Sequence, residues 1–322
     1  MSGSALPSRD AIVATARERI GRGSQSFAAA SRLFDRPTRE RAWLLYAWCR
    51  ACDDIADGQD FGGEMSRVGA RVSDPAARLA EITAKTDAAL AGRVIGDPAF
   101  DALRIVAAET RLPAQFTRDL IAGFALDADD WRPRSEDDLY RYCYHVAGVV
   151  GCMMAVIMGV DPGDEATLDR ACDLGMAFQL SNIARDIEED DRAGRCYLPE
   201  EWLVEMDIPP GQHMKPPFRK RLAVLARRLA DAGAAFEDSA RLGTPALPFR
   251  SAWAVLSAAA IYGAIGRKVA NGGEHAWDCR VTTTRWEKLR FIARAWGEAR
   301  ERVRRYPPEA RNPELWTRPR GS

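Results

Sequence analysis

Apolar residues recur at the three- and four-residue spacing of α-helices along most of this 322-residue chain, and no sustained alternating pattern of β-strands accompanies them. Pro and Gly interrupt the pattern at turns such as Asp161-Pro162-Gly163 and Asn271-Gly272-Gly273. The predicted helices are Arg9–Arg22, Arg39–Asp57, Pro75–Ala91, Pro98–Thr110, Pro113–Ala128, Glu136–Met158, Glu165–Asp190, Pro217–Arg241, Ser251–Ala270 and Thr284–Arg304. The spacing therefore predicts an all-α fold of about a dozen helices.

The chain shows no shift in composition, long linker or low-complexity block that would mark a domain boundary. We therefore expect a single helical domain over residues 1–306. A flexible tail rich in Pro and Arg is expected over residues 307–322.

Charge and hydropathy exclude several classes of protein. Lys plus Arg and Asp plus Glu both number 46, so no basic excess indicates nucleic-acid binding. The seven cysteines lack the spacing of a disulfide framework, and the N-terminal residues lack the apolar core of a signal peptide. The longest uncharged stretches, Val146–Val160 and Ser251–Gly266, are shorter than the roughly 18 residues of a membrane-spanning helix. We expect a cytoplasmic protein that is soluble or rests on the inner membrane surface, although no single strongly basic amphipathic helix stands out.

One predicted helix contains two aspartates a helical turn apart, with polar partners before them. Tyr46, Arg50, Asp53 and Asp57 follow one another at steps of four, three and four residues. At about 100° per residue, these steps place all four on one face of the helix. This helix therefore presents a row of polar side chains that ends in two carboxylates.

A second predicted helix repeats the arrangement. Gln179, Asn182, Asp186 and Asp190 stand at steps of three, four and four residues and so share one face as well. A solvated acidic surface is the alternative for any single pair of aspartates. Like charges at i and i+4 destabilise a helix, however, and both rows are set among apolar residues. Carboxylates in an apolar frame indicate the wall of a cavity, where they need a counter-ion.

The chemistry of the two rows indicates a magnesium site. They offer oxygen ligands and contain neither Cys nor His, so Mg²⁺, with Mn²⁺ as the alternative, fits better than zinc or copper. Such ions can neutralise a diphosphate leaving group, and apolar walls can shield a carbocation from water. Arg50 and Arg185 are suited to bind phosphate, as is Arg192, for which pairing with neighbouring carboxylates is an equal alternative. An isoprenoid diphosphate combines these two needs.

Four segments with these motifs follow one another in a familiar order: Gly23–Phe27, Tyr46–Asp57, Tyr142–Gly151, and Gln179–Asp190 with Gly194–Pro199. Together they resemble the squalene and phytoene synthase family of head-to-head prenyl synthases over nearly the whole chain. Within that family, Tyr142–Gly151 and Ala276-Trp277-Asp278 are most similar to the bacterial phytoene synthases. The resemblance implies an isoprenoid-synthase-type helical bundle with a central cavity.

The resemblance also implies a reaction. Two molecules of geranylgeranyl diphosphate would condense head to head, through a cyclopropylcarbinyl (prephytoene) diphosphate, to phytoene with release of diphosphate. This is the first committed step of carotenoid biosynthesis. No nicotinamide cofactor is expected, and association with a membrane surface or with other carotenoid-pathway enzymes is compatible with this function.

Individual roles follow from the resemblance, residue by residue. The implied metal ligands are Asp53, Asp57, Asn182, Asp186 and Asp190. Catalytic roles are implied for the four aspartates together with Arg50 and Tyr142. Contacts to substrate are implied for Ser24, Ser26, Phe27, Tyr46, Ala147, Val150, Gly151, Gly175, Gln179, Asn182, Arg185, Tyr262 and Arg280. Simpler interpretations remain open for some of them, since small residues also allow close helix packing, serines also cap helices, and a tyrosine in an apolar helix is commonly a core residue.

Three other functions compete with this one. A squalene or dehydrosqualene synthase would use the shorter farnesyl diphosphate, and the length of the cavity decides between the two substrates. Asp53-Asp54-Ile-Ala-Asp57 also reads as the DDxxD of a head-to-tail chain-elongating synthase, but the second motif and Tyr197-Leu198-Pro199 favour the head-to-head class. An inactive helical assembly factor would lack a metal aspartate, and all four are present.

Overall fold

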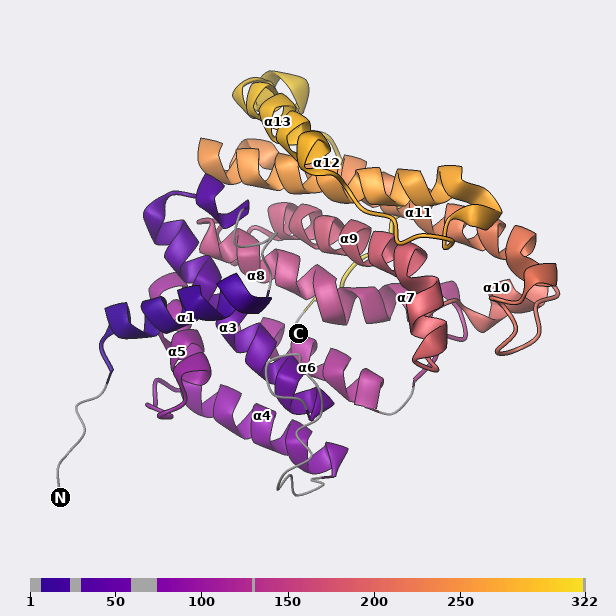
Figure 1. Ribbon diagram of the computed structural model, residues 1–322. Coiled ribbons are helices and arrows are strands. Elements are labelled where there is room, and N and C mark those ends of the chain that lie inside the picture. Colours follow the sequence, from indigo (N-terminus) through magenta and orange to yellow (C-terminus); the bar gives the residue numbers. More distant parts are fainter. Residues whose placement is uncertain (1–6, 24–29, 59–73, 129–130, 321–322) are drawn as a thin grey trace. The chain divides into compact units, whose positions relative to one another are not determined.

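The computed structural model describes residues 7–23, 30–58, 74–128 and 131–320, and its regular secondary structure in these ranges is entirely helical (Figure 1). The prediction of an all-α fold is therefore confirmed. The chain divides into two compact units, residues 1–129 with 156–163 and residues 130–155 with 164–322. A single domain over residues 1–306 stays a prediction.

The first unit contains the first aspartate motif. Its helices are α1 (Arg9–Gly23), η1 (Ser31–Leu33), α3 (Arg36–Asp57), α4 (Pro75–Leu90), α5 (Pro98–Thr110) and α6 (Ala114–Ala128). Helix α3 begins where the Asp35 carboxylate accepts a hydrogen bond from the Thr38 amide (2.9 Å), and it ends at Gly58, whose φ of +67° favours glycine. Trp48 is fully buried and donates its indole N–H to Thr86 Oγ1 on α4 (3.2 Å). Capping and burial thus define the position of α3.

The second unit contains the second aspartate motif. Its helices are α7 (Glu136–Cys143), the π-helical turn η2 (Tyr144–Gly148), α8 (Val149–Ile157), α9 (Glu165–Arg192), α10 (Glu200–Glu205), η3 (Pro216–Phe218), α11 (Arg219–Arg241), η4 (Thr244–Ala246), α12 (Phe249–Gly272), η5 (Gly273–His275) and α13 (Arg285–Arg305). Helix α9 packs against α11 and α12, and α13 packs against α12 (Figure 1). The motif helix α9 therefore lies inside a helical layer, and its neighbours hold it in place.

The predicted helix Glu136–Met158 is divided into α7, η2 and α8 in the structure. The π-helical turn η2 lies where this segment passes α9, and a Cβ on Gly148 would approach Cys172 Sγ to 2.9 Å. A single widened turn of this kind leaves the apolar pattern almost unchanged. Helical periodicity therefore predicts the segment but not its interruption.

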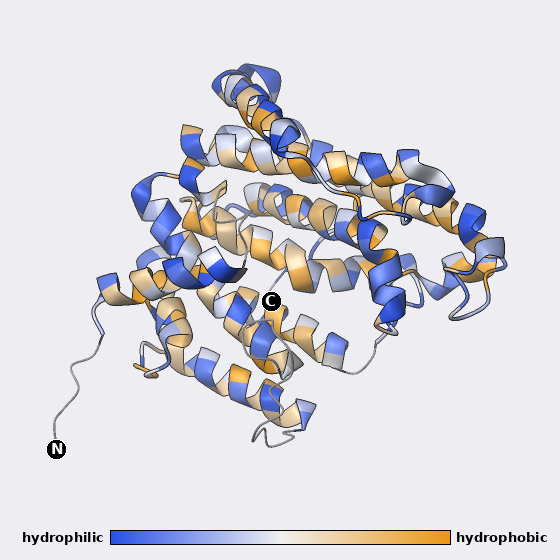
Figure 2. Ribbon diagram, viewed as in Figure 1, coloured by the Kyte–Doolittle hydropathy of each residue, from blue (hydrophilic) through white to orange (hydrophobic). Residues whose placement is uncertain are grey.

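Hydrophobic and hydrophilic residues are interspersed along the helices (Figure 2), and the apolar ones supply the buried core. Examples are Leu44 and Phe100 in the first unit and Leu180 and Phe236 in the second, all of which are almost completely buried. Within the described ranges, no helix combines the length and the apolarity that crossing a membrane requires.

The C-terminal residues 307–320 form no helix and contact α9 through charged side chains. Arg311 Nη2 lies 2.6 Å from Asp173 Oδ1, and Arg318 Nε lies 2.9 Å from Asp169 Oδ1. Trp316 donates its indole N–H to Asp137 Oδ1 on α7 (2.8 Å). This segment thus joins two helices of the second unit.

Candidate active site

Helix α3 displays the first aspartate motif at its C-terminal end. Arg50 Nη1 lies 2.8 Å from Asp53 Oδ2, and Arg50 Nη2 lies 2.7 Å from Asp54 Oδ1. The side chain of Asp53 is 41% exposed, whereas that of Asp54 is 14% exposed, so Asp53 is the more accessible carboxylate. Tyr46 is half-buried, and this burial raises the pKa of its hydroxyl. Asp57 is the last residue of α3, one helical turn after Asp53.

Helix α9 displays the second motif, also near its C-terminal end. Asp186 accepts a hydrogen bond from Arg185 Nε (2.7 Å), and this bond raises the pKa of the Arg185 guanidinium. Arg280, from the loop between η5 and α13, approaches the same carboxylate, with its Nη2 atom 3.1 Å from Asp186 Oδ1. Arg280 also pairs with Glu189. Two guanidiniums therefore converge on Asp186, one from its own helix and one from a distant loop.

A turn comes directly after the motif in the sequence, at the end of α9. The backbone carbonyl of Asp190 accepts a hydrogen bond from the Arg195 amide (2.8 Å). Gly194 in this turn has a φ of +75°, a conformation that favours glycine. The turn fixes the direction in which the chain leaves Asp190 and thereby positions the loop that contains Tyr197.

Asn182 supplies an observation that favours a metal ion as ligand. Its side-chain oxygen Oδ1 is buried and has no hydrogen-bond partner in the part of the chain that the structure describes. An unsatisfied buried acceptor is costly, and such groups commonly mark a ligand site. With Asp186 and Asp190 on the same face of α9, the acceptor completes a donor set made only of oxygen, which suits Mg²⁺. The residues on α9 thus fit the predicted ion.

The carboxylates of one motif are too few to supply every ligand of a metal ion from protein side chains. In the described ranges, no three side chains from His, Cys, Asp and Glu come together as a metal site. Mg²⁺ in proteins is usually held by one or two carboxylates together with waters and substrate phosphate oxygens. The arrangement on α9 agrees with that mode of binding.

Tyr262 on α12 lies beside the second motif. Its ring stacks on Phe178 of α9, with centroids 4.1 Å apart and planes inclined by 21°. Burial raises the pKa of Tyr262, and the positive charge of Arg185 acts in the opposite direction. The sequence alone left Tyr262 open as a core residue, whereas the structure places it near an arginine of the motif.

Tyr142 lies in a stack of three aromatic rings. It is 4% exposed, and its ring centroid is 5.5 Å from that of Trp131 and 4.9 Å from that of Tyr197. Both pairs are close to parallel, with planes inclined by 23° and 20°. Tyr197 belongs to the loop that follows the second motif, so the stack connects α7 to that loop.

The small residues of η2, α8 and α9 lie where these elements cross. A Cβ on Gly175 would come within 2.2 Å of the Ala147 carbonyl oxygen, and a Cβ on Gly151 would come within 2.2 Å of the Ala171 carbonyl oxygen. Both glycines therefore permit backbone contact between the helices. Val150 is half-buried beside them. The structure thus supports the packing interpretation of Gly151 and Gly175 and does not bear on contact with a substrate chain.

Gly175, Gln179, Asn182, Asp186 and Asp190 form a continuous row along α9. From Gly175 to Asp186 the row extends about 16 Å at 1.5 Å per residue. Its N-terminal end lies against the small residues of η2, and its C-terminal end carries the carboxylates and the arginines. The row therefore changes along α9 from small and apolar surroundings to charged ones.

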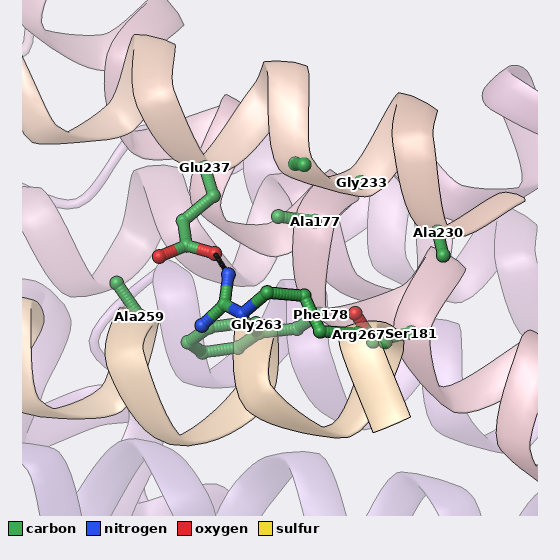
Figure 3. A pocket seen from close by; sticks show the side chains of 11 residues that line it. Ala177, Phe178, Ser181, Ala230, Gly233, Glu237, Ala259, Gly263 and Arg267 are labelled. Atoms are coloured by element: carbon green, nitrogen blue, oxygen red, sulfur yellow. Dashed lines mark hydrogen bonds and ion pairs between the residues drawn. The ribbon is translucent and has the colours of Figure 1, made fainter. Parts of the chain in front are cut away.

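A small pocket lies on a different face of α9, between α11 and α12 (Figure 3). Ala177, Phe178 and Ser181 of α9 line it together with Glu237 of α11 and Arg267 of α12. Glu237 is buried and pairs with Arg267 (Nη1–Oε2 3.3 Å) and with Arg241. None of the predicted substrate-binding residues lines this pocket.

Three predicted substrate contacts, Ser24, Ser26 and Phe27, lie outside the described residues. The others fall in one or other of the two units. Of these contacts, Tyr46 belongs to the first unit and the rest belong to the second. Arg50, Asp53 and Asp57, with predicted catalytic or metal-binding roles, also belong to the first unit.

Comparison with known proteins decides the family. The model of the squalene/phytoene synthase family matches residues 20–287. The 15-cis-phytoene synthase of Pantoea ananas is 46% identical over 303 residues, which cover 94% of this chain and 96% of that protein. The 15-cis-phytoene synthase of Enterobacter agglomerans is 48% identical over 299 residues, covering 92% of this chain and 99% of that protein.

The chain belongs to the squalene/phytoene synthase family. The resemblance drawn from the sequence motifs is thereby confirmed. A solved structure of a dehydrosqualene synthase in complex with a ligand superposes with a TM-score of 0.78 at 24% identity, covering 91% of this chain and 98% of that one. At this level of identity the superposition supports the shared fold alone.

For a squalene/phytoene synthase of this sequence, the structure adds residues that the sequence analysis did not assign to the site. The rings of Trp131 and Tyr197 each stack on the Tyr142 ring. Tyr197 was recognisable as part of the Gly194–Pro199 segment, whereas no spacing or motif distinguishes Trp131. Only the folded chain brings Trp131 to α7.

Proposed function

We propose that this chain is a magnesium-dependent phytoene synthase that joins two molecules of geranylgeranyl diphosphate head to head. The reaction runs through a cyclopropylcarbinyl diphosphate, and over its two steps it releases two diphosphates and two protons. The observation that supports it is the 46% identity over 94% of the chain to a 15-cis-phytoene synthase. The row of oxygen-bearing side chains on α9 and the arginines beside it agree with a substrate that carries a diphosphate.

The two aspartate motifs would hold the metal ions. Their ligands are Asp53 and Asp57 of α3 and Asn182, Asp186 and Asp190 of α9. Mg²⁺, when bound, neutralises the charge of the leaving diphosphate and so promotes its departure from the allylic carbon. The buried acceptor Asn182 Oδ1 is one group whose missing partner such an ion would supply.

The arginines would bind and orient the diphosphate groups. Arg185 and Arg280 both reach the Asp186 carboxylate, and Arg50 reaches Asp53, so each guanidinium already lies beside a proposed metal ligand. Arginine binds phosphate in a bidentate fork and keeps its charge at every pH of interest. Ser24, Ser26 and the Tyr262 hydroxyl are further proposed contacts to phosphate oxygens.

The remaining residues would hold the hydrocarbon chains and exclude water from the reacting carbons. We assign this role to Phe27, Tyr46, Ala147, Val150, Gly151, Gly175 and Gln179. Tyr142 would orient the intermediate as a polar group through its hydroxyl, because its ring is stacked on Trp131 and Tyr197. The stack of Trp131, Tyr142 and Tyr197 keeps the Tyr142 ring in one orientation, which favours such a role.

Substrate and product are both lipids, so a cytoplasmic enzyme of this kind benefits from contact with a membrane surface. We propose peripheral attachment to the inner membrane, and association with other enzymes of carotenoid synthesis. Detergent-free fractionation at low and high salt tests the attachment. A protein recovered entirely in the soluble fraction at both salt concentrations would contradict it.

Product analysis tests the proposed activity. The purified protein is incubated with Mg²⁺ and either geranylgeranyl or farnesyl diphosphate, and the organic extract is separated and weighed by mass spectrometry. We expect a C40 hydrocarbon with a conjugated triene from geranylgeranyl diphosphate and no product when EDTA is added. A C30 product from farnesyl diphosphate alone would indicate a dehydrosqualene-type or squalene-type synthase instead. Turnover of neither substrate would favour a non-catalytic member of the family.

A further inference from the structure

Helix α13 packs against α12 with one side only. Ala295 and Ala299 on this side are buried, and Trp253 of α12 donates its indole N–H to the Ile292 carbonyl (2.8 Å). In Figure 1, α13 lies on the side of α12 that faces away from α9, and both helices belong to the second unit. The other side of α13 is therefore an outer surface of this unit.

That outer surface carries large apolar side chains. Trp286 is 81% exposed, Leu289 57%, Trp296 43% and Val303 67%. At about 100° per residue, these four side chains fall within roughly 100° of arc, so they form one stripe along the helix. They are four of the seven large hydrophobic side chains that are exposed in the described part of the chain, and the other three are valines on separate helices or loops. A stripe of this composition indicates a contact surface.

The same helix is strongly basic. It contains eight Lys or Arg residues and three Glu, although the chain as a whole has no net charge. Six of the arginines are exposed, namely Arg285, Arg290, Arg294, Arg300, Arg304 and Arg305. The glutamates are engaged locally, since Glu287 pairs with Lys268, Glu298 with Arg241 and Glu301 with Arg304. The charge that α13 presents outward is therefore positive.

The positive charge and the apolar stripe together indicate which kind of partner binds to α13. A second copy of this chain would present the same arginines in a two-fold interface, and the two helices would repel one another. An anionic lipid surface attracts the arginines, and its headgroup region accepts tryptophan and leucine side chains. Arg300 lies over the Trp296 ring (4.8 Å), so cation and aromatic ring can enter the headgroup region side by side.

We infer that α13 is the membrane-docking helix of this protein and that it lies in the headgroup region of a bilayer containing anionic phospholipid. Trp286, Leu289, Trp296 and Val303 enter the acyl boundary, and the exposed arginines contact lipid phosphates. This inference names the surface for the peripheral attachment proposed above, but it rests on the surface of α13 and does not depend on the reaction. The amphipathic character of α13 was not recognised from the sequence. Its packed side also contains apolar residues, such as Phe291 and Ile292, so the outward stripe does not stand out in the pattern.

Vesicle flotation of the full chain tests the inference. The probes are large unilamellar vesicles of phosphatidylcholine alone and of phosphatidylcholine with phosphatidylglycerol. One variant combines Trp286→Ser, Leu289→Ser and Trp296→Ser, and a second combines Arg290→Gln, Arg294→Gln and Arg300→Gln. The matched control is Val204→Ser, which removes a 75% exposed side chain from α10.

We expect the wild-type chain and the control to bind anionic vesicles and to bind neutral vesicles much more weakly. Each triple variant lowers the partition coefficient on anionic vesicles by at least about tenfold. The arginine variant loses its preference for anionic lipid, and added salt weakens wild-type binding. Because all six side chains are exposed, both variants should keep the wild-type circular dichroism spectrum and unfolding midpoint.

Three results would overturn the inference. Undiminished flotation of both triple variants would show that α13 does not dock, and equal binding to the two vesicle types would exclude the anionic partner. If, in the absence of lipid, the wild type sediments as a dimer and the tryptophan variant as a monomer in analytical ultracentrifugation, the stripe is an interface between copies.

Turnover of geranylgeranyl diphosphate in detergent micelles is measured in parallel, and we expect it to be unchanged in both variants. If the wild type forms no C40 product there, the proposed function fails while the vesicle result stands.

Discussion

In both aspartate motifs, arginine guanidiniums lie against the motif carboxylates. Arg50 contacts Asp53 and Asp54, and Arg280 contacts Asp186 and Glu189. A guanidinium can bind carboxylate and phosphate oxygens in the same forked geometry. We therefore expect these arginines to exchange carboxylate oxygens for diphosphate oxygens when a substrate binds together with its metal ions.

At the residue scale, we predict that Asp186→Asn abolishes turnover without unfolding the protein. The amide keeps the size of the side chain but removes the charge that would hold a cation and orient Arg185 and Arg280. Product formation should fall at least about a hundredfold. The matched control is Glu188→Gln on the same helix, where the carboxylate pairs with Arg192 on a different face. Equal activity in the two variants would contradict the role of Asp186.

Much of the candidate site was predictable at this scale because helical spacing alone aligns its members. The row from Gln179 to Asp190 needs only α9 to be a helix, and α9 is one. Arg280 could not be placed from spacing, since it reaches Asp186 from a loop 94 positions later in the sequence. Trp131 was missed for the same reason, because its contact with Tyr142 depends on how the chain enters α7. Contacts made by loops are set by the fold, and periodicity does not report them.

At the scale of elements, the crossing of η2 and α9 depends on the absence of a side chain at Gly175. A methyl group there would come within 2.2 Å of the Ala147 carbonyl oxygen and 2.7 Å of Gly148 Cα. We predict that Gly175→Ala destabilises the fold by about 1–3 kcal/mol, because backbone must move to admit it. Equilibrium unfolding in urea measures this change in free energy.

Gly233→Ala on α11 is the matched control for that experiment. Its Cβ would meet the Ala177 carbonyl oxygen at 3.5 Å and Leu180 Cβ at 3.7 Å, which are ordinary van der Waals distances. Because Ala is favoured over Gly in helices, this variant should be neutral or more stable by up to about 1 kcal/mol. A Gly175→Ala protein as stable as Gly233→Ala would contradict the close crossing.

The N-terminus of α13 provides a prediction about pH. The Glu287 carboxylate accepts hydrogen bonds from Lys268 Nζ (2.8 Å) and from the Thr284 amide (2.8 Å), and these lower its pKa to about 2 from an ordinary 4.5. Because the folded chain binds this proton more weakly than the unfolded chain does, the stabilisation is complete above pH 4.5 and is lost as the pH falls towards 2.

We predict that Glu287→Gln unfolds at lower urea concentration than the wild type at neutral pH. The difference between the two midpoints should shrink as the pH falls from 4.5 to 2. A difference that stays constant over this interval would show that the charge of Glu287 does not stabilise α13.

At the scale of the whole molecule, arginines of the C-terminal segment pair with buried carboxylates of α9. Asp173 is fully buried, and it accepts hydrogen bonds from Arg311 Nη2 (2.6 Å) and Arg311 Nε (2.9 Å). Burial raises the pKa of Asp173, and Arg311 and Ser239 act in the opposite direction. The helix therefore relies on a partner 138 residues later in the sequence.

We predict that Arg311→Gln destabilises the protein by about 3 kcal/mol, because it removes the guanidinium that hydrogen-bonds to both oxygens of a buried carboxylate. Adding Asp173→Asn to this variant should restore part of the loss, and a double-mutant cycle in urea measures the coupling. Arg141→Gln is the control, since its partner Asp137 and Arg141 itself are both more than half exposed, and it should cost less than about 1 kcal/mol. Equal losses for Arg311→Gln and Arg141→Gln would show that the segment does not stabilise α9.

The features of the fold that depend on local sequence pattern were predictable. The predicted helices match both ends of α9 and α13 and the end of α3 to within two residues, whereas α3 begins at Arg36, before the predicted Arg39, because Asp35 caps it. The family follows from ordered motifs. The pairing of the C-terminal arginines with α9 was not predictable, because composition shows only that the segment is charged and rich in proline. Partners distant in sequence are determined by the complete fold.

The measurement that tests the central claim most directly is a competition between substrates. The purified chain is given equal concentrations of geranylgeranyl and farnesyl diphosphate with Mg²⁺, and the hydrocarbon products are counted by chain length. A phytoene synthase should form the C40 hydrocarbon as the main product, and Asp186→Asn should form none. A main product of C30 would contradict the assignment and identify an enzyme that prefers the shorter substrate.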